Sequence, residues 1–225
     1  MLKLVIIDLD DTIINYTEAH NIAFDILIQQ ITKYSTCDYA TIIQKHKDVK
    51  SKLYNQYDKQ FIRHDKLLQL KLLCNELHIR DTKIISELYN VYETTYIDNI
   101  TIHNKCMYFL HLCRNNNIKV SIMTNNLLPI QLKVCNKLNL NELVDAIFTS
   151  NEFFYEKPHH ECLHYILNYY GCTNDETLII GDSIENDIKW GQTNDVKSIL
   201  CDNKSEETSF QTCINYVESI LTANG

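Results

Sequence analysis

Short apolar runs alternate with helical segments through the second half of this chain, and this alternation limits its fold most. The runs cover residues 119–123, 146–148, 177–180 and 197–200. Segments in which apolar residues recur at helical spacing precede them, at about 105–115, 129–138, 159–170 and 185–190. A further apolar run at residues 2–7 opens the chain. Strands alternating with helices form a parallel sheet covered on both faces, so we expect an α/β core.

The stretch between the first apolar run and the remaining ones has a different character. From about residue 16 to residue 96, apolar residues recur at helical spacing, and neither glycine nor proline interrupts them. This pattern predicts a block made only of helices. We therefore expect two domains: an α/β core formed by residues 1–14 and 99–225, and a helical domain inserted at 15–98.

Composition argues against several common classes of protein. The 225 residues include four glycines, so neither a Gly-x-Gly-x-x-Gly turn nor a Gly-x-x-x-x-Gly-Lys loop is present. No apolar run is long enough to cross a bilayer, and Asp8, Asp10 and Asp11 interrupt the first one, unlike a signal peptide. The net charge of −8 disfavours nucleic acid as a partner. We expect no membrane partner either.

The cysteines and histidines do not predict a metal site. The nine cysteines are scattered and form no Cys-x-x-Cys pair, so we expect no zinc. Without a signal peptide, reduced thiols and a cytoplasmic location are the simplest expectation. We expect surface or interface positions, with a spacing that suits no metal, for five histidines: His103, His111, His159, His160 and His164.

Polar residues follow the ends of the predicted strands. Asp8, Asp10 and Thr12 follow the first run, and Thr124, Asn125 and Asn126 follow the second. Lys157 and Pro158 come after the third run, and Gly181, Asp182 and Asp187 come after the fourth. In an open parallel sheet the carboxyl ends of the strands meet at one edge, where ligands bind. These side chains are therefore expected to converge.

Such a set of side chains suits phosphoryl transfer through a carboxylate. Crowded carboxylates repel one another, and a hard cation with oxygen ligands relieves that repulsion and neutralises an incoming phosphate. One carboxylate can attack phosphorus and form an aspartyl-phosphate. Another, two residues on, can protonate the leaving oxygen and later activate water. A hydroxyl, backbone amides and a lysine can hold the remaining phosphoryl oxygens.

Four motifs, in this order, resemble those of the haloacid dehalogenase (HAD) superfamily. They are Asp8-x-Asp10-x-Thr12, Thr124, Lys157-Pro158 and Gly181-Asp182-x-x-x-x-Asp187. The resemblance implies a Rossmann-like parallel-sheet core with an inserted all-helical cap, and a magnesium-dependent phosphatase. Because the insertion follows the first motif directly, it resembles the small helical cap of the phosphatase-rich branch. The chain looks most similar there to nucleoside monophosphate and acylneuraminate-phosphate phosphatases.

The resemblance also implies a role for each matched residue. Asp8 is the nucleophile and a Mg²⁺ ligand, and Asp10 is the general acid and base, with its backbone carbonyl on the metal. Thr124, with Asn125 beside it, binds the phosphoryl oxygens. Lys157 steadies the nucleophile and the phosphate.

The last motif completes the metal site that the resemblance implies. Asp182 is a direct Mg²⁺ ligand, and Asp187 is either a ligand or an anchor that acts through water. Two departures from the usual pattern stand out. His159 follows Pro158 where aspartate is common, which is expected to alter only the start of a helix. Asn125 and Asn126 follow Thr124 where glycine often comes second, which can change how this loop approaches the substrate.

The leading hypothesis is hydrolysis of a small phosphomonoester, such as a nucleoside monophosphate or a sugar phosphate. A cap inserted directly after the nucleophile strand is expected to lie over the carboxyl edge and to leave a closed chamber. Selectivity would then rest on cap side chains and on the segment near Asn15, Tyr16 and His20.

Three other functions remain open. A phosphomutase shares the four motifs and differs in passing the phosphoryl group to a sugar. A nucleic-acid end-processing phosphatase is disfavoured by the acidic charge and by the absence of a dense basic stripe. A non-catalytic binding protein would have been indicated by loss of Asp8 or Asp10. Asp10 also favours phosphoryl transfer over carbon–halogen cleavage, because dehalogenases of this superfamily usually lack it.

Overall fold

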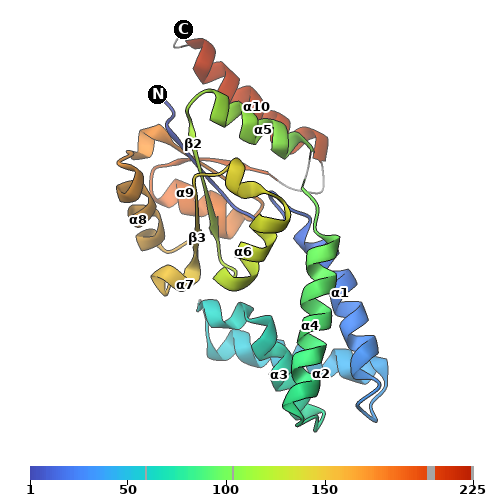
Figure 1. The fold of residues 1–225 in the computed structure, drawn as a ribbon. Helices are drawn as coiled ribbons and strands as arrows, with labels where there is room; N and C mark the ends of the chain where they lie inside the picture. The colour runs from blue at the N-terminus through green and yellow to red at the C-terminus, as the bar shows by residue number, and fades with distance from the viewer. Residues whose placement is uncertain (59, 103, 202–205, 224–225) are drawn as a thin grey trace. The chain divides into compact units, whose positions relative to one another are not determined.

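The structure is a computed structural model that describes residues 1–58, 60–102, 104–201 and 206–223. It divides into two compact units (Figure 1). The core unit consists of residues 1–15 and 101–225, and the helical insertion is Tyr16–Ile100. His103, which was expected at the surface, lies outside the described residues.

Five parallel strands form the centre of the core unit, in the order β3-β2-β1-β4-β5. They are β1 (Leu4–Ile7), β2 (Lys119–Thr124), β3 (Ala146–Thr149), β4 (Thr177–Gly181) and β5 (Lys197–Leu200). The central strand β1 pairs with both neighbours, so that Leu4 lies opposite Lys119 on one side and Thr177 on the other. All four residues of β1 are buried, as expected for a strand covered on both faces. The predicted α/β fold with a parallel sheet is confirmed.

The helices of the core unit lie between and after these strands. They are α5 (Asn104–Asn115), α6 (Leu128–Lys137), α7 (Ser150–Phe153), α8 (His160–Tyr170), α9 (Lys189–Thr193) and α10 (Glu206–Ala223). The sequence did not predict α7 or α10. The short helix expected at 185–190 is instead a π-helical turn, Ile184–Ile188, that runs into α9. Turns of this kind occur often at functional sites.

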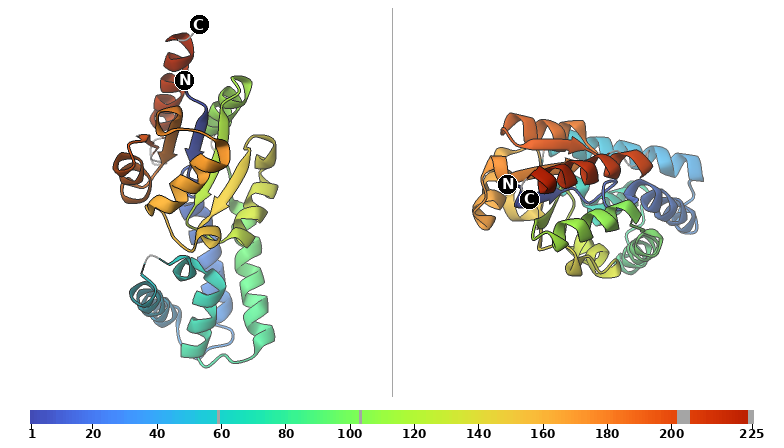
Figure 2. Two further views of the ribbon diagram at one scale, coloured as in Figure 1. Left: turned by 90° about the vertical axis from the view of Figure 1, so that its left-hand side faces the viewer. Right: turned by 90° about the horizontal axis from the view of Figure 1, so that it is seen from above.

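Helices cover both faces of the sheet. On one face, Leu4 and Ile6 of β1 pack in an apolar cluster with residues of α8, such as Ile166, and with the fully buried Trp190 of α9. On the other face, α5 and α10 run side by side (Figures 1 and 2). Their contact includes the rings of Phe109 and Phe210, whose centroids are 6.0 Å apart. Apolar burial on both faces is the main stabilising contribution to such a core.

The helical insertion consists of α1 (Tyr16–Ile31), α2 (Tyr39–Gln56), α3 (Lys66–Glu76) and α4 (Thr82–Asn99), with a short 3₁₀ turn at Phe61–His64. Helices α1 and α4 pack along each other. Aspartates cap three of the helices, because Asp38, Asp65 and Asp81 each accept a hydrogen bond from a backbone N–H of the first turn. Strands are absent from its described residues, as predicted. Throughout the described chain, no helix combines the length and apolar character that a membrane span requires.

Two half-buried histidines pack against aromatic residues of the insertion. The hydroxyl of Tyr92 lies 2.7 Å from Nδ1 of His20, and the ring of His46 lies 4.5 Å from that of Phe24. Both histidines border a cavity of about 20 Å³, which is enough for about one water molecule. Burial lowers the pKa of His20 to about 3 and that of His46 to about 4, and the nearby charge of Lys66 acts in the same direction. Both imidazoles are therefore neutral in the folded protein near pH 7.

The segments of the core unit just before and just after the insertion are hydrogen-bonded to each other. The backbone N–H of Thr101 donates to Oδ1 of Asn15 at 2.7 Å, and the N–H of Asn15 donates to the carbonyl of Thr101 at 3.3 Å. Next to them, Ile14 and Ile102 form an antiparallel bridge. These contacts hold the two ends of the insertion together within the core unit, so a long insertion can be accommodated without disturbing the sheet.

Candidate active site

The candidate site is built at the carboxyl edge of the sheet, around the end of β1. The N–H of Asp8 donates to the carbonyl of Ile180 at 2.9 Å, which extends the pairing of β1 with β4 beyond the strand. Two residues beyond Asp10, the hydroxyl of Thr12 accepts a hydrogen bond from the N–H of Asp182 at 3.0 Å. These contacts fix the loop after β1 against the loop after β4. They hold the first and last predicted motifs together.

Lys157 connects two of the predicted carboxylates. Its Nζ lies 2.7 Å from Oδ1 of Asp8 and 2.6 Å from Oδ1 of Asp187, and all three side chains are buried. Burial alone would lower the pKa of Lys157, but Asp187 and Asp8 together raise it above its usual value. The ammonium group of Lys157 is therefore kept charged between these two carboxylates.

Three carboxylates converge around this ammonium group. Oxygen atoms of Asp8, Asp182 and Asp187 all lie within 4.8 Å of one another. Burial raises the pKa of Asp8 well above its usual value, Lys157 opposes that effect, and Asp187 adds to it. Burial and the neighbouring Asp187 raise the pKa of Asp182 to about 6. One lysine does not balance three carboxylates, so the donor set fits a hard divalent cation with oxygen ligands.

The position of Asp187 depends on a glycine and on the π-helical turn. An ideal Cβ added to Gly181 would lie 2.2 Å from Cγ of Asp187, so the carboxylate occupies the space that a side chain at 181 would need. The turn brings Asp187 back toward the strand, because its N–H donates to the carbonyl of Ser183 at 2.9 Å. Its Oδ2 accepts in return from the N–H of Ser183 at 3.1 Å.

Asp10 lies in a separate polar pocket. Its Oδ2 accepts hydrogen bonds from Thr124 at 3.0 Å, Asn126 at 3.1 Å and Gln131 at 2.8 Å. Its Oδ1 is buried and has no hydrogen-bond partner among the described residues. Burial raises the pKa of Asp10, and the bonds from Asn126, Thr124 and Gln131 partly oppose that effect. This carboxyl is therefore biased toward carrying a proton more than an exposed aspartate is.

Asn125 is turned toward the loop that carries Lys157. Its Oδ1 accepts from the N–H of Lys157 at 2.8 Å and from the hydroxyl of Ser150 at 3.1 Å, and its Nδ2 donates to the carbonyl of Lys157 at 3.1 Å. The sequence predicts instead that this side chain contacts the phosphoryl group. In the structure both ends of its amide are engaged by protein atoms, so it positions the lysine loop.

The structure thus sorts the predicted residues into two groups. Asp8, Lys157, Asp182 and Asp187 form one cluster, and Asp10 and Thr124 form the other. Sequence reasoning missed Gln131, which lies on α6 and does not follow a strand directly. His159 begins α8, since its Nδ1 accepts from the N–H of Glu161 at 3.3 Å, which agrees with the expected change at the helix start.

The chain matches a family of hydrolases. Residues 5–201 match the family model described as haloacid dehalogenase-like hydrolase, so the chain belongs to that family. It is also 28% identical, over 191 residues, to the glyceraldehyde 3-phosphate phosphatase of Methanocaldococcus jannaschii. That alignment covers 84% of this chain and 80% of the archaeal protein. The family and this relative support phosphatase activity, and the predicted resemblance is confirmed.

Solved structures share the fold at lower sequence identity. A HAD phosphatase from Thermococcus onnurineus has a TM-score of 0.70 at 17% identity, covering 88% of this chain and 86% of its own. A 2-haloacid dehalogenase from Pseudomonas syringae has a TM-score of 0.70 at 18% identity, covering 89% and 86%. YfnB from Bacillus subtilis, crystallised bound to magnesium, has a TM-score of 0.66 at 19% identity and covers 88% of each chain. At these identities the similarity concerns the fold alone.

Proposed function

We propose that this protein is a magnesium-dependent phosphomonoesterase that transfers the phosphoryl group of a small metabolite to Asp8 and then to water. The observation that carries the proposal is the buried cluster of Asp8, Lys157 and Asp187, with Asp182 beside it. Beside the end of β1, the cluster combines a carboxylate, a positive charge and oxygen atoms that could bind a cation. This is the set that phosphoryl transfer through a carboxylate requires.

The cation would be held by Asp8 and Asp182, with Asp187 close behind them and the backbone carbonyl of Asp10 as a further oxygen donor. A bound Mg²⁺ ion supplies charge neutralisation for the phosphate and its ligands. Lys157 contributes a second positive charge that does not depend on the ion. Asp187 binds Lys157 through Oδ1 and the N–H of Ser183 through Oδ2, so we assign it mainly to holding the lysine in place.

In the first proposed step, a carboxylate oxygen of Asp8 attacks phosphorus while the bond from phosphorus to the ester oxygen breaks. Asp10 gives its proton to the departing oxygen, so the alcohol leaves neutral. The raised pKa of Asp10 and its free Oδ1 support this role. Thr124 and Lys157 remain the proposed phosphate ligands. The ammonium group of Lys157 has a third N–H besides those given to Asp8 and Asp187, whereas the Thr124 hydroxyl would turn its one proton from Asp10 to a phosphoryl oxygen.

In the second proposed step, water attacks the aspartyl-phosphate. Asp10, now ionised, takes a proton from this water as the new oxygen–phosphorus bond forms. Cleavage of the bond between Asp8 and phosphorus releases inorganic phosphate and restores both carboxyl groups. The amide donors of Asn126 and Gln131 to Oδ2 of Asp10 keep its orientation the same in both steps.

The proposed substrate is a small phosphomonoester, either a sugar phosphate or a nucleoside monophosphate. The archaeal relative is named for glyceraldehyde 3-phosphate, which supports a small phosphorylated metabolite. The net charge of −8 supports the same class, because a long polyanion would be repelled.

A phosphate-release assay with Mg²⁺ over a panel of sugar phosphates and nucleotides tests the proposal, with Asp8→Asn as the inactive control. Stoichiometric phosphate release without any sugar acceptor is the expected result. Transfer of the phosphoryl group to a second sugar instead would make the protein a phosphomutase. Release of halide from 2-haloacids, without phosphate release, would overturn the proposal.

A further inference from the structure

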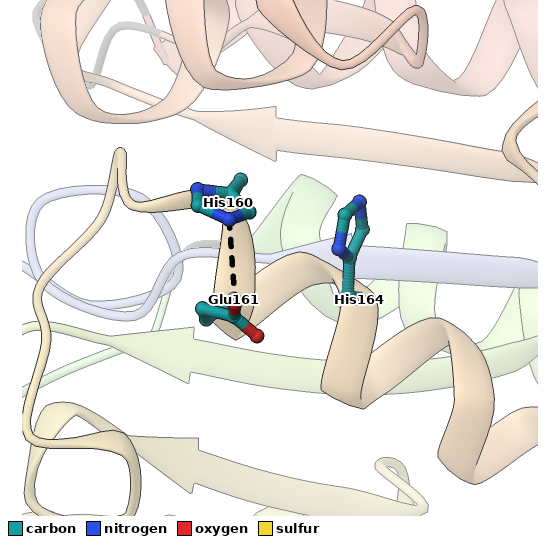
Figure 3. Close-up of side chains that lie close together, drawn as sticks. All are labelled: His160, Glu161 and His164. Carbon is teal, nitrogen blue, oxygen red and sulfur yellow. Dashed lines mark ion pairs between the residues drawn. The ribbon is translucent and has the colours of Figure 1, made fainter.

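The first turns of α8 carry a second cluster of potential metal ligands, made of His160, Glu161 and His164. All three side chains are exposed, and one ligand atom from each lies within 4.8 Å of the other two. Nε2 of His160 lies 3.3 Å from Oε1 of Glu161, and the rings of His160 and His164 have centroids 5.4 Å apart. Figure 3 shows the three side chains together beside the helix. Residues four apart on a helix share a face, so one ion can reach both imidazoles.

We propose that His160, Glu161 and His164 bind a divalent transition-metal ion such as Zn²⁺ or Cu²⁺. Two imidazole nitrogens and one carboxylate oxygen are typical ligands for these ions. The carboxylate cluster at Asp8 differs in kind, because it offers only oxygen donors and suits a hard cation. Ion selectivity therefore distinguishes the two sites, and the α8 site does not rest on the proposed phosphatase function.

Neighbouring rings support the His160 side chain. The ring of Tyr155 stacks on that of His159 at 3.9 Å, and His159 stacks on His160 at 4.7 Å. His159 also caps the helix through the N–H of Glu161. A side chain held in this way loses less conformational freedom when an ion binds. The proposal departs from the expectation that the spacing of His160 and His164 suits no metal, because their ligand atoms lie within 4.8 Å of each other.

The single tryptophan offers a local reporter. Nε1 of Trp190 donates to the carbonyl of His159 at 3.0 Å, so the indole is hydrogen-bonded to the residue that caps α8, next to the proposed site. Copper quenches nearby tryptophan fluorescence. The experiment titrates the full chain with Cu²⁺, and separately with Zn²⁺ by calorimetry, in excess Mg²⁺ as a competitor for the carboxylate cluster. We expect binding of one ion, quenching of Trp190, and weaker affinity at acidic pH because protons compete for imidazole nitrogens.

Three variants test which side chains bind the ion. His160→Ala and His164→Ala should each weaken Zn²⁺ and Cu²⁺ binding at least tenfold, ~1.4 kcal/mol. Glu161→Gln should weaken it less, because it removes one charge and keeps both imidazoles. His111→Ala is the matched control, since His111 is exposed on α5, away from this cluster, and should bind both ions as the parent does.

Two results would overturn the proposal. One is unchanged affinity in the double variant His160→Ala, His164→Ala. The other is binding that disappears in Asp182→Asn while both histidine variants retain it, which would place the ion at the carboxylate cluster. Imidazole NMR signals of the parent protein give a test that needs no variant to fold. Zn²⁺ should shift the signals of His160 and His164 and leave that of His111 in place, and the opposite pattern would refute the site.

Discussion

The carboxylate of Asp187 occupies the space where Gly181 would carry a side chain, with Cγ only 2.2 Å from an ideal Cβ at that position. This contact brings the end of β4 and the π-helical turn together, and it aims Oδ1 of Asp187 at Lys157. Lys157 in turn lies 2.7 Å from Asp8. The position of Lys157 beside Asp8, the proposed nucleophile, therefore depends on a glycine at position 181.

Gly181→Ala should therefore impair catalysis without any change to a charged group. The added methyl must displace Asp187, which loosens Lys157 and separates the carboxylates. We expect kcat/KM to fall at least about 100-fold, ~2.7 kcal/mol in the transition state. Steady-state kinetics and a thermal melt measure the effect. Gly171→Ala is the matched control: its φ of 63° is strained for alanine by about 1 kcal/mol, but no atom lies within 4 Å of the added Cβ. Equal activity losses in the two variants would contradict this argument.

Asp8→Asn should abolish turnover, because it keeps the size of the side chain and removes the nucleophilic charge. We expect a loss of at least about 10³-fold, ~4 kcal/mol, in phosphate release. Circular dichroism should show that the fold survives. Asp11→Asn is the control from the same loop, since the left-handed backbone at Asp11, with φ of 60°, also suits asparagine. Near-parental activity of freshly purified Asp8→Asn would exclude Asp8 as the nucleophile.

Several residues of the candidate site could be predicted from the sequence because each follows a predicted strand. Asp8 directly follows the first apolar run and Asp182 follows the fourth after Gly181, and parallel strands bring such positions to one edge. Gln131 could not be predicted, because one buried glutamine on a helix resembles many that only fill space. Asn125 was predicted at the right edge, but an amide can bind protein or ligand, and only the coordinates show that it binds the Lys157 loop.

The missed C-terminal helix is a different case, because its signal was present. Phe210, Cys213, Ile214 and Val217 are all buried and recur at the spacing of one helix face. The π-helical turn at Ile184–Ile188 had no such signal. Its geometry follows from tertiary contacts of Asp187 with Gly181 and Lys157, which periodicity does not encode.

Metal removal should stop turnover, and Mg²⁺ should restore it. Chelation leaves Asp8, Asp182 and Asp187 crowded and the incoming phosphate repelled, so phosphate release in excess chelator should fall below detection. Calcium should bind but support turnover poorly, since its looser coordination misplaces the attacking carboxylate. Asp182→Asn should raise the Mg²⁺ concentration needed for half-maximal rate at least tenfold. Full activity in excess chelator is the outcome that rules out a metal requirement.

Asp10→Asn should discriminate between leaving groups. An alkyl alcohol needs a proton as it departs, whereas nitrophenolate leaves readily without one. In single-turnover experiments with enzyme in excess, cleavage of an alkyl phosphate should slow about 10²–10⁴-fold, and release of nitrophenol much less. Single turnovers are required because loss of Asp10 also slows the attack of water in the second step. Equal losses for both substrates would make Asp10 a structural residue.

Acid should destabilise the helical insertion through His20 and His46. Their pKa values are lowered to about 3 and about 4, so the unfolded chain binds more protons than the folded one between those values and about 6.5. Stability from this source is complete above about pH 6.5 and decreases as the pH falls. Lys50 and Lys66 add positive charge nearby, and the hydroxyl of Tyr92 contacts His20. By pH 5.5 each histidine should cost roughly 1 kcal/mol of unfolding free energy.

Urea unfolding followed by circular dichroism at pH 7 and pH 5.5 measures this decrease, and a substitution isolates it. His46→Phe retains an aromatic ring against Phe24 and cannot bind a proton, so its unfolding free energy should fall by about 1 kcal/mol less than that of the parent over this range. The comparison between proteins is essential, because the raised pKa values of Asp8 and Asp182 act with the opposite sign and favour the folded core as pH falls. The control is His111→Phe, which changes an exposed histidine of the core unit and should follow the parent. If the parent and His46→Phe lose the same stability between the two pH values, His46 titrates normally and the insertion does not sense acid through it.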